Sequence, residues 1–410
     1  MKALIKDKPT DSTPWPTGLR LEDRPIPSDL RPDEVLIRVV AAGICGTDSG
    51  IYHCKSSIRN EMLKIQGDSV IIGHEFCGKI HTAGAEALLR LAQIVEHTAR
   101  VDSQTAGFVR GRTAAQLAAD LNFADYLKEH FIASAEMHIT CGWCYQCRLG
   151  DQHVCRNTVI KGVHADGAFA EYVKVPAGNL VLFRAGELPT SIIAFMDAIG
   201  NAVHTVQSAN VMGQNTIVLG AGTQGVMAAA IAHRSGAGRV YITDFSNPAR
   251  GMTHEKLDHN RFAHARRLGV TDCFDLALPE ERDRMKKRIM DETNGTGVDV
   301  ALEMSGSYSA YRDAFDLLRM GGTFALLGIP EGEIKIDFAR EVIFRGLTIK
   351  GVIGRRVFET WEVMRNLLAG GLARDLLDSG FVSPELPLEQ FEDGFAALAR
   401  GEALKVILKP

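Results

Sequence analysis

The fold of this chain is decided by residues 216–244, which read TIVLGAGTQGVMAAAIAHRSGAGRVYITD. A short apolar strand leads into a glycine-rich turn, a helix of small residues follows, and a second apolar strand ends at Asp244. This order of strand, turn, helix and strand is typical of a βαβ unit that binds a dinucleotide. The glycines of the turn have the G-x-G-x-x-G spacing of that unit: Gly220, Gly222 and Gly225.

The glycine turn predicts a pyrophosphate site. The first glycine permits the tight turn, the second lets the backbone approach the ligand, and the third allows helix and strand to pack closely. The pyrophosphate then lies at the helix N-terminus, where free N–H groups favour an anion. Asp244 can accept hydrogen bonds from ribose hydroxyls and repels a 2′-phosphate, so it favours NAD over NADP. Arg250 is near in the sequence and could accommodate such a phosphate.

The alternation of strands and helices continues after this unit. Residues 262–270 predict a helix, and three apolar runs predict buried strands at 298–306, 321–330 and 346–354. Strands that alternate with helices form a mostly parallel sheet. We therefore expect an α/β fold with a doubly wound Rossmann sheet.

Four cysteines upstream of this unit form a C-x₂-C-x₂-C-x₇-C pattern: Cys141, Cys144, Cys147 and Cys155. Four thiolates on one short loop match the tetrahedral geometry of a closed structural zinc site. The alternatives are two disulfides or four unrelated thiols. We expect a cytosolic protein without a secretory leader, and clustered cysteines in such a protein usually bind metal, so we expect zinc.

A second, sparser set of metal ligands precedes the cysteine loop. It consists of Cys45, in AAGICGTD, and the pair His74–Glu75, in VIIGHEFCG. A thiolate, an imidazole and a carboxylate, with one position left open, are the ligands of a catalytic zinc ion. Each residue alone has an ordinary explanation, because a lone cysteine in an apolar strand is usually a core residue. Their combination upstream of the cysteine loop favours the zinc site.

Composition narrows the class of protein. The chain has 410 residues, of which 46% are hydrophobic and 23% charged, and its net charge is −4. Those values predict a globular protein of about two domains, without the basic surface that nucleic-acid binding requires. No apolar run is long enough to span a membrane, so we expect a cytoplasmic protein. The remaining cysteines are expected to be reduced thiols: Cys54, Cys77 and Cys273.

With both zinc-ligand sets ahead of the Rossmann unit, the chain resembles the medium-chain, zinc-dependent alcohol dehydrogenases. Within that superfamily it is most similar to the L-threonine 3-dehydrogenase family. The resemblance rests on HITCGWCYQCRLGDQHVCRNT (138–158), GAFAEYVKVPAGN (167–179), DAIGNAVHT (197–205), LEMSG (302–306), LLGIP (326–330) and VIFRGLTIKGVIGRRVFETW (342–361). It implies a GroES-like, β-rich catalytic domain beside the Rossmann domain, and a homo-oligomer, either a tetramer or a dimer.

The resemblance also implies residue roles. Thr47 would take the substrate's hydroxyl proton, Asp197 would act beside the metal as a ligand or in the proton path, and His138 would lie beside the substrate. The implied dinucleotide contacts, for which Arg250 is an alternative to Arg261, are Gln224, Asp244, Arg261, Leu327, Gly328, Ile329, Val352 and Ile353. The chain departs from the family at Gly50, where a histidine usually passes the proton to solvent. His53 or water is expected to take its place.

The domains are predicted at residues 1–190 (catalytic), 191–354 (NAD-binding) and 355–410 (a return to the catalytic domain). A helical insertion is expected at about 82–135, with amphipathic helices over 85–100 and 111–131. It forms either a lobe packed on the catalytic domain or a lid over the substrate. A second insertion, at 246–259, could touch the adenosine end of the cofactor.

Taken together, the sequence predicts an NAD-dependent enzyme with one catalytic and one structural zinc ion. It would oxidise a secondary alcohol to a ketone, with L-threonine, converted to 2-amino-3-oxobutanoate, as the first candidate. A polyol or amino-sugar dehydrogenase is the alternative within the class. A cofactor-binding paralogue without turnover is the alternative outside it.

Overall fold

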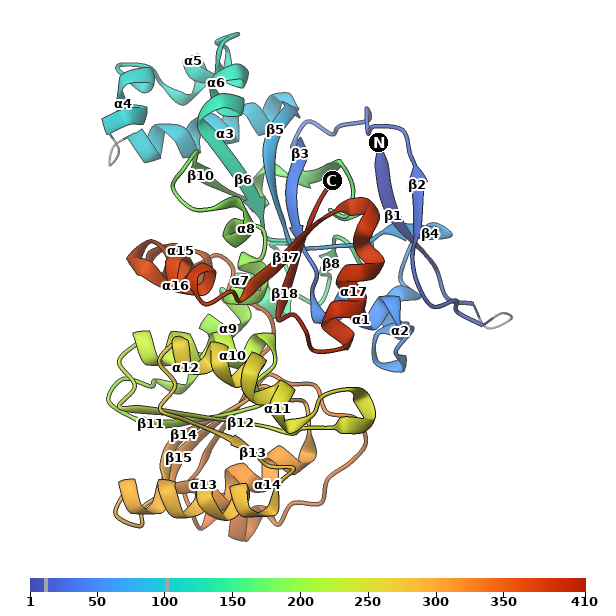
Figure 1. Cartoon of the computed structure of the whole chain (residues 1–410). Helices are drawn as coiled ribbons and strands as arrows, with labels where there is room; N and C mark the ends of the chain where they lie inside the picture. Colours follow the sequence, from blue (N-terminus) through green and yellow to red (C-terminus); the bar gives the residue numbers. More distant parts are fainter. Residues whose placement is uncertain (11–13, 100–102) are drawn as a thin grey trace.

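The computed structural model describes residues 1–10, 14–99 and 103–410. Two sheet-containing regions are stacked, with α15 (Glu359–Leu367) and α16 (Ala373–Asp378) between them (Figure 1). The lower region is built around a single parallel sheet, and the upper region around mainly antiparallel strands. The predicted α/β fold, with a Rossmann sheet and a β-rich second part, is confirmed.

The lower sheet has six strands in the order β13-β12-β11-β14-β15-β16, and every neighbouring pair is parallel. This is the doubly wound order, whose switch point lies between β11 and β14. Its strands are β11 (Asn215–Leu219), β12 (Arg239–Asp244), β13 (Asp272–Asp275), β14 (Val298–Glu303), β15 (Leu318–Leu326) and β16 (Thr348–Gly351).

Helices cover both faces of this sheet (Figure 1). The helix of small residues forms as predicted and begins after Gly222, its N-cap. A Cβ on Gly225 would overlap the carbonyl oxygen of Gly220, so only glycine allows this turn and helix to meet. The helices are α9 (Met196–Ala209), α10 (Thr223–Arg234), α11 (His254–Leu257), α12 (Ala263–Arg267), α13 (Pro279–Glu292) and α14 (Tyr308–Leu317).

The upper region holds a seven-stranded sheet in the order β10-β6-β5-β3-β18-β17, with β9 also paired to β3. Its strands are β3 (Glu34–Gly43), β5 (Phe76–Ala83), β6 (Phe131–Ala135), β9 (Tyr172–Pro176), β10 (Leu180–Arg184), β17 (Val382–Pro387) and β18 (Lys405–Lys409). Two small sheets flank it, formed by β1 (Lys2–Asp7), β2 (Arg20–Asp23) and β4 (Ser69–Ile71), and by β7 (His138–Ile139) and β8 (Val159–Ile160).

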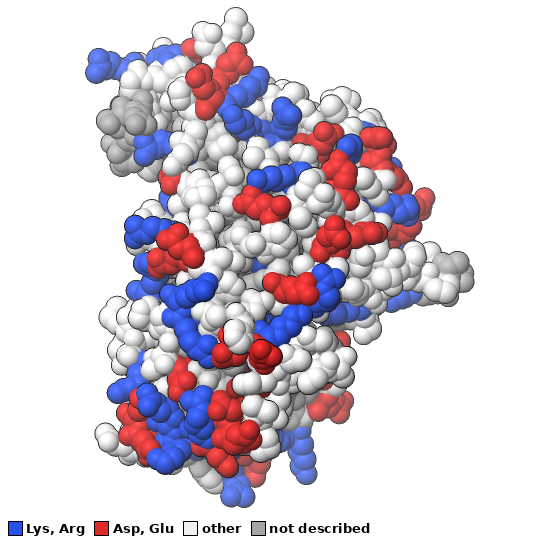
Figure 2. All heavy atoms as spheres, viewed as in Figure 1, with Lys and Arg blue, Asp and Glu red and all other residues white. Residues whose placement is uncertain are grey.

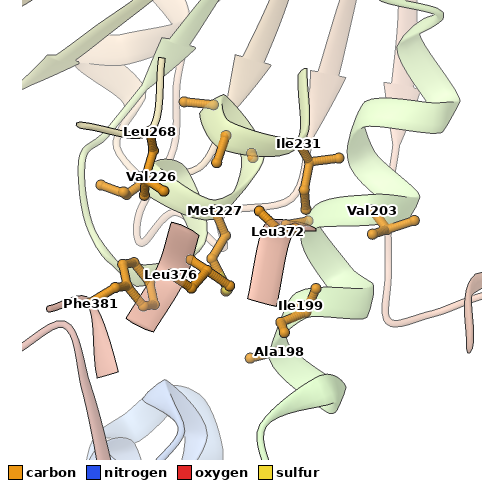
Figure 3. Packing of buried hydrophobic residues seen from close by; sticks show 14 of the residues in the cluster. Ala198, Ile199, Val203, Val226, Met227, Ile231, Leu268, Leu372, Leu376 and Phe381 are labelled. Carbon is orange, nitrogen blue, oxygen red and sulfur yellow. The ribbon is translucent and has the colours of Figure 1, made fainter. Parts of the chain in front are cut away.

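The C-terminal segment joins the two regions. Its last strand, β18, pairs antiparallel with β3 and so returns to the upper sheet. Side chains of the segment, including Leu372 and Leu376, also pack against α9 and α10 (Figure 3). The remaining helices of the upper region and of this segment are α1 (Gly46–Tyr52), α2 (Ser56–Met62), α7 (Tyr145–Arg148), α8 (Thr190–Ile193), α15 (Glu359–Leu367), α16 (Ala373–Asp378) and α17 (Phe391–Ala399).

The first insertion is a helical lobe of α3 (Ala85–Ala99), α4 (Ser103–Val109), α5 (Ala114–Ala118) and α6 (Phe123–His130). The helix predicted over 85–100 is present, whereas the single helix predicted over 111–131 is wrong. Thr113 begins a new helix by accepting a hydrogen bond from Gln116 N, and Asp120 accepts one from Asn122 N and makes a turn. Figure 1 shows the lobe at the end of the molecule opposite the parallel sheet, so it does not cover the space between the two sheets.

Candidate metal and cofactor sites

The four cysteines of the short loop converge on one point. Their Sγ–Sγ distances include 3.5 Å for Cys144–Cys147, 3.6 Å for Cys141–Cys155, 3.8 Å for Cys144–Cys155 and 4.0 Å for Cys141–Cys147. Zn–S bonds of about 2.3 Å in a tetrahedron place the sulfurs about 3.8 Å apart. A disulfide would need about 2.0 Å. The spacing therefore fits a zinc ion and excludes disulfides between these cysteines.

Hydrogen bonds in this loop favour the thiolate form of Cys141. Cys141 Sγ accepts from Cys144 N at 3.3 Å and from Asn157 Nδ2 at 3.4 Å. Burial opposes ionisation, but the hydrogen bonds from Asn157 and the backbone outweigh it and lower the pKa of Cys141 to about 6. Burial and the hydrogen bonds with Cys144 and Cys155 raise the pKa of Cys147 to about 12, so Cys141 ionises readily whereas Cys147 would need a bound cation to become the thiolate that binds metal.

The second ligand set is also assembled. Cys45 caps the N-terminus of α1 where β3 ends, and His74 and Glu75 lie between β4 and β5. Their ligand atoms all lie within 4.8 Å of one another, and His74 and Glu75 are buried. Burial and the nearby Glu75 carboxylate raise the pKa of the Cys45 thiol. Glu75 Oε1 is buried without a hydrogen-bond partner among the described residues. A half-buried thiol, a buried imidazole and a buried carboxylate whose Oε1 lacks a partner fit a divalent cation.

Asp48 orients this set, and sequence reasoning missed it. It is fully buried, its Oδ1 lies 3.4 Å from His74 Nδ1, and its Oδ2 accepts a hydrogen bond from Cys45 N at 2.8 Å. A carboxylate behind a ligand histidine fixes the ring orientation and makes the other nitrogen a better donor. The signal was present in the sequence as an acid three residues after Cys45, the spacing of a capping box.

Asp197 and His138 meet in a buried network around Arg355. The Arg355 Nη2 lies 2.6 Å from Asp197 Oδ1, 2.5 Å from Glu136 Oε1 and 2.7 Å from His138 Nδ1. Trp361 Nε1 donates to Glu136 Oε2 at 2.9 Å. Burial on its own would raise the pKa of Glu136, but Arg355 and His138 hold it well below its usual range. Glu136, Arg355 and Trp361 were absent from the sequence-based site.

Thr47, the departure at Gly50 and its expected substitute His53 lie on or just after α1. Thr47 is half-buried in its first turn, two residues after Cys45. Gly50 is buried, and a Cβ there would make only ordinary contacts, 3.8 Å from Ile58 Cγ2 at the nearest. His53 is exposed at the end of α1, with its ring edge against Tyr52. The proton-relay roles of Thr47 and His53 stay predictions.

The glycine turn lies at the carboxyl edge of the parallel sheet, directly after β11. Gly220 has φ +106°, a conformation that L side chains rarely adopt. A Cβ on Gly222 would face open space, so the backbone there is accessible to a ligand. Gln224, in the first turn of α10, has a buried Oε1 without a hydrogen-bond partner among the described residues. An exposed turn at a helix N-terminus with an unpartnered amide oxygen fits a dinucleotide.

The predicted adenosine contact is an ion pair here. Asp244 ends β12, and its Oδ2 lies 2.7 Å from Arg261 Nη1. Arg261 therefore is next to Asp244 in space, although it follows the second insertion. That insertion contacts the C-terminal segment, because Lys256 Nζ donates to Glu402 Oε1 at 3.4 Å. Asn260, which directly follows the insertion, donates its Nδ2 to the Gly401 carbonyl oxygen at 2.6 Å. The side chain of Arg250, the alternative residue, lies outside the described part of the chain.

The residues predicted for the nicotinamide half follow two further strands at the same edge. Leu327, Gly328 and Ile329 come after β15, and Val352 and Ile353 come after β16. Ile329 and Ile353 are largely exposed, whereas Val352 is buried. Arg355 comes two residues after Ile353, so this edge of the sheet continues directly into the network around Asp197.

Comparison with known proteins decides the family. The profile of the alcohol dehydrogenase GroES-like domain matches residues 31–106 and 132–185, and that of zinc-binding dehydrogenases matches residues 225–370. The chain belongs to the zinc-dependent alcohol dehydrogenase family. It is therefore an oxidoreductase that acts on the CH–OH group of a small molecule. The GroES-like match skips residues 107–131, which lie in the helical lobe.

Relatives and solved structures agree with this assignment. The L-threonine 3-dehydrogenase of Chelativorans sp. (strain BNC1) is 37% identical and aligns with 100% of this chain and 98% of its own length. Galactitol-1-phosphate dehydrogenase from Escherichia coli has the same fold, with a TM-score of 0.74, 21% identity and full coverage of both chains. A zinc-binding dehydrogenase from Sinorhizobium meliloti 1021 bound to NADP has a TM-score of 0.72 and 24% identity, again with full coverage.

The surface adds little to this description. Lys and Arg are interspersed with Asp and Glu on the face in Figure 2, without one broad field of a single sign. No described helix combines the length and apolar character needed to cross a membrane.

Proposed function

We propose that this protein oxidises a secondary alcohol to a ketone with NAD, and that L-threonine is its substrate. The observation that carries the proposal is Arg355. This residue directly follows the segment predicted to line the nicotinamide, and it is ion-paired with Asp197 beside the Cys45, His74 and Glu75 set. The metal ligands and the hydride-accepting ring would thus lie on opposite sides of one substrate site. The choice of L-threonine is supported by the names of relatives that are 34–37% identical over at least 96% of this chain.

The side chains would divide the reaction between them. Cys45, His74 and Glu75 would hold a zinc ion, which as a Lewis acid lowers the pKa of a bound hydroxyl. Thr47 would accept the hydroxyl proton. His138 would contact a polar group of the substrate, and Asp197 would stay beside the metal set, held by Arg355.

The remaining residues would hold the cofactor. The glycine turn and the N-terminus of α10 would bind the pyrophosphate. Asp244 would accept hydrogen bonds from the ribose, and this supports NAD rather than NADP. The four-cysteine loop would hold a second zinc ion with no open position. Metal analysis of the purified protein should therefore find two zinc ions per chain.

We also propose the division into residues 1–190, 191–354 and 355–410, supported by the pairing of β18 with β3. A homo-oligomer is proposed as well. Its support is β16, an edge strand whose residues are all exposed, together with the exposed Ile343 and Phe344. The unpaired backbone groups of an exposed edge strand are a ready site for pairing with another chain. Light scattering coupled to size exclusion distinguishes a tetramer, a dimer and a monomer.

The activity is tested by following NADH absorbance with L-threonine, diols, polyols and amino sugars. L-threonine should give the highest kcat/KM with NAD. If a polyol or an amino sugar is oxidised and L-threonine is inert, the alternative within the class replaces the proposal. If no alcohol is oxidised by protein that retains both zinc ions, the non-catalytic paralogue is favoured. Cys45→Ser should abolish turnover and remove one of the two ions.

A further inference from the structure

Lys405 is a buried cation directly behind the predicted catalytic metal set. Its side chain is 1% exposed, and its Nζ forms an ion pair with Glu75 Oε2. The same Nζ donates a hydrogen bond to the carbonyl oxygen of Ile44 at 2.9 Å and lies 5.4 Å from the centre of the Phe195 ring. Burying an ammonium group is strongly unfavourable unless it is paired. Lys405 is therefore held in place by the residue before Cys45 and by Glu75 itself.

The backbone leaves room for this pair at Gly43. A Cβ on Gly43 would overlap Glu75 Oε2 and would lie 3.1 Å from Lys405 Cε and from Phe195 Cβ. Gly43 ends β3, where β18 pairs with it. Any larger residue at this position would push the carboxylate and the ammonium apart. The strand that leads to Cys45 is thus shaped around the ion pair.

The start of β18 is also held by a residue of the predicted cofactor-binding turn. Thr223, at the first position of α10 after the glycine turn, donates its hydroxyl to the carbonyl oxygen of Leu404 at 2.5 Å. Leu404 directly precedes Lys405. The lysine backbone therefore has little freedom to follow the carboxylate if Glu75 moves.

The two oxygens of Glu75 have different surroundings. Both oxygens are buried and neither accepts a hydrogen bond in the described part of the chain, but Oε2 forms the ion pair with Lys405, whereas Oε1 has no ion-pair partner there. We propose that Lys405 is a positioning residue that occupies one oxygen of Glu75, so that this carboxylate binds the catalytic zinc through Oε1 alone. The proposal rests on the zinc site of the proposed function and adds to it the way one coordination position is kept open.

Binding through one oxygen of Glu75 limits the number of ligands that the protein supplies to the catalytic metal. A carboxylate that binds through both oxygens supplies two ligands, and with Cys45 and His74 it would fill four positions. A catalytic site needs one of these for substrate. Pairing with Lys405 also withdraws negative charge from the metal, which leaves the zinc a stronger Lewis acid. Lys405 would therefore support turnover without touching substrate.

The test replaces zinc with cobalt(II), whose visible d–d bands weaken as the coordination number rises. Wild type, Lys405→Met and Lys405→Arg are compared as full-length protein, and each variant spectrum is subtracted from that of the wild type, so that the four-cysteine site cancels. Lys405→Met should show weaker bands at two cobalt ions per chain, and kcat should fall about 10- to 100-fold. Lys405→Arg should restore most of the intensity and turnover.

Lys6→Met is the matched control. Lys6 is also a buried lysine of the catalytic region, but its Nζ donates to the carbonyl oxygens of Pro16 and Gly18. Its loss should lower stability and leave the cobalt bands unchanged. Gly43→Ala, which acts on the same ion pair from the backbone, should change the bands as Lys405→Met does and provides the test if that variant does not fold.

The outcomes separate this inference from the proposed function. Unchanged cobalt bands in both Lys405→Met and Gly43→Ala, with two ions bound, would overturn the role of Lys405 only. Loss of the catalytic ion from Lys405→Met would also overturn it, because Glu75 would then need the lysine in order to bind metal at all. A wild-type protein that holds one ion per chain would instead refute the zinc site on which the inference depends.

Discussion

Arg355→Met is the substitution whose effect the structure defines best. Arg355 is 1% exposed, and it lies between the carboxylates of Glu136 and Asp197, which are 0% and 5% exposed. Methionine fills a similar volume without the charge. It leaves two buried carboxylates that no longer have their cationic partner.

The expected loss of stability is large. Removing one partner of a buried ion pair costs about 3–5 kcal/mol, because the remaining charge is buried and uncompensated. At about 2–4 °C per kcal/mol for a domain of 150–250 residues, the melting temperature should fall by about 6–20 °C. The neighbouring Arg356 is a matched control. It is 46% exposed and pairs with Glu359 at 2.9 Å, so Arg356→Met should cost less than about 1 kcal/mol.

The assay is thermal unfolding followed by circular dichroism at several pH values. The pKa of Glu136 is held well below its usual range in the folded protein. Its stabilising contribution is therefore complete above the unfolded pKa of about 4.3 and is lost as the pH falls through the folded value. The difference between wild type and Arg355→Met should be largest at neutral pH and narrow as the pH falls toward the folded pKa of Glu136 in the wild type.

A second substitution makes the reasoning refutable. Adding Glu136→Gln to Arg355→Met removes one uncompensated charge, so part of the lost stability should return at neutral pH. The reasoning is refuted if the melting temperature of Arg355→Met falls no further than that of Arg356→Met, or if adding Glu136→Gln lowers the stability of Arg355→Met further. The buried ion pair would then not be what stabilises this part of the protein.

Three further predictions concern the site. Thr47→Ala should lower kcat by about 10²-fold or more, which is the usual contribution of a positioned proton acceptor. Its affinity for NAD, measured by calorimetry, should stay unchanged. Unchanged turnover would remove Thr47 from the reaction. Asp244→Asn should release Arg261 to bind a 2′-phosphate. The ratio of kcat/KM for NAD to kcat/KM for NADP should therefore fall about 10-fold or more. A constant ratio would contradict the ribose contact. Cys147→Ser should lose one zinc ion by metal analysis and unfold at lower temperature, while retention of both ions would place the second zinc elsewhere.

Several parts of the fold and site could be predicted because their information is local in the sequence. The glycine turn needs three glycines within six residues, and the cysteine loop needs four thiols within fifteen residues. The second helix of the insertion was predicted wrongly, although its capping signal at Thr113 is local too. Over 111–131 the prediction gave more weight to apolar residues at the spacing of one long helix than to the helix cap and the turn within that range.

The amino-acid sequence by itself determined the class of sheet, the position of the glycine turn and the residue types that can hold metal. Only the tertiary structure decided which charges surround them. Glu136 and Arg355 are 219 residues apart in the chain, and Lys405 and Ile44 are 361 apart. In the sequence, an arginine or lysine near a strand end indicates a solvated side chain, because a cation is buried only when it is paired. The partners that make burial possible come from distant strands, so they are recognised only once the chain is folded.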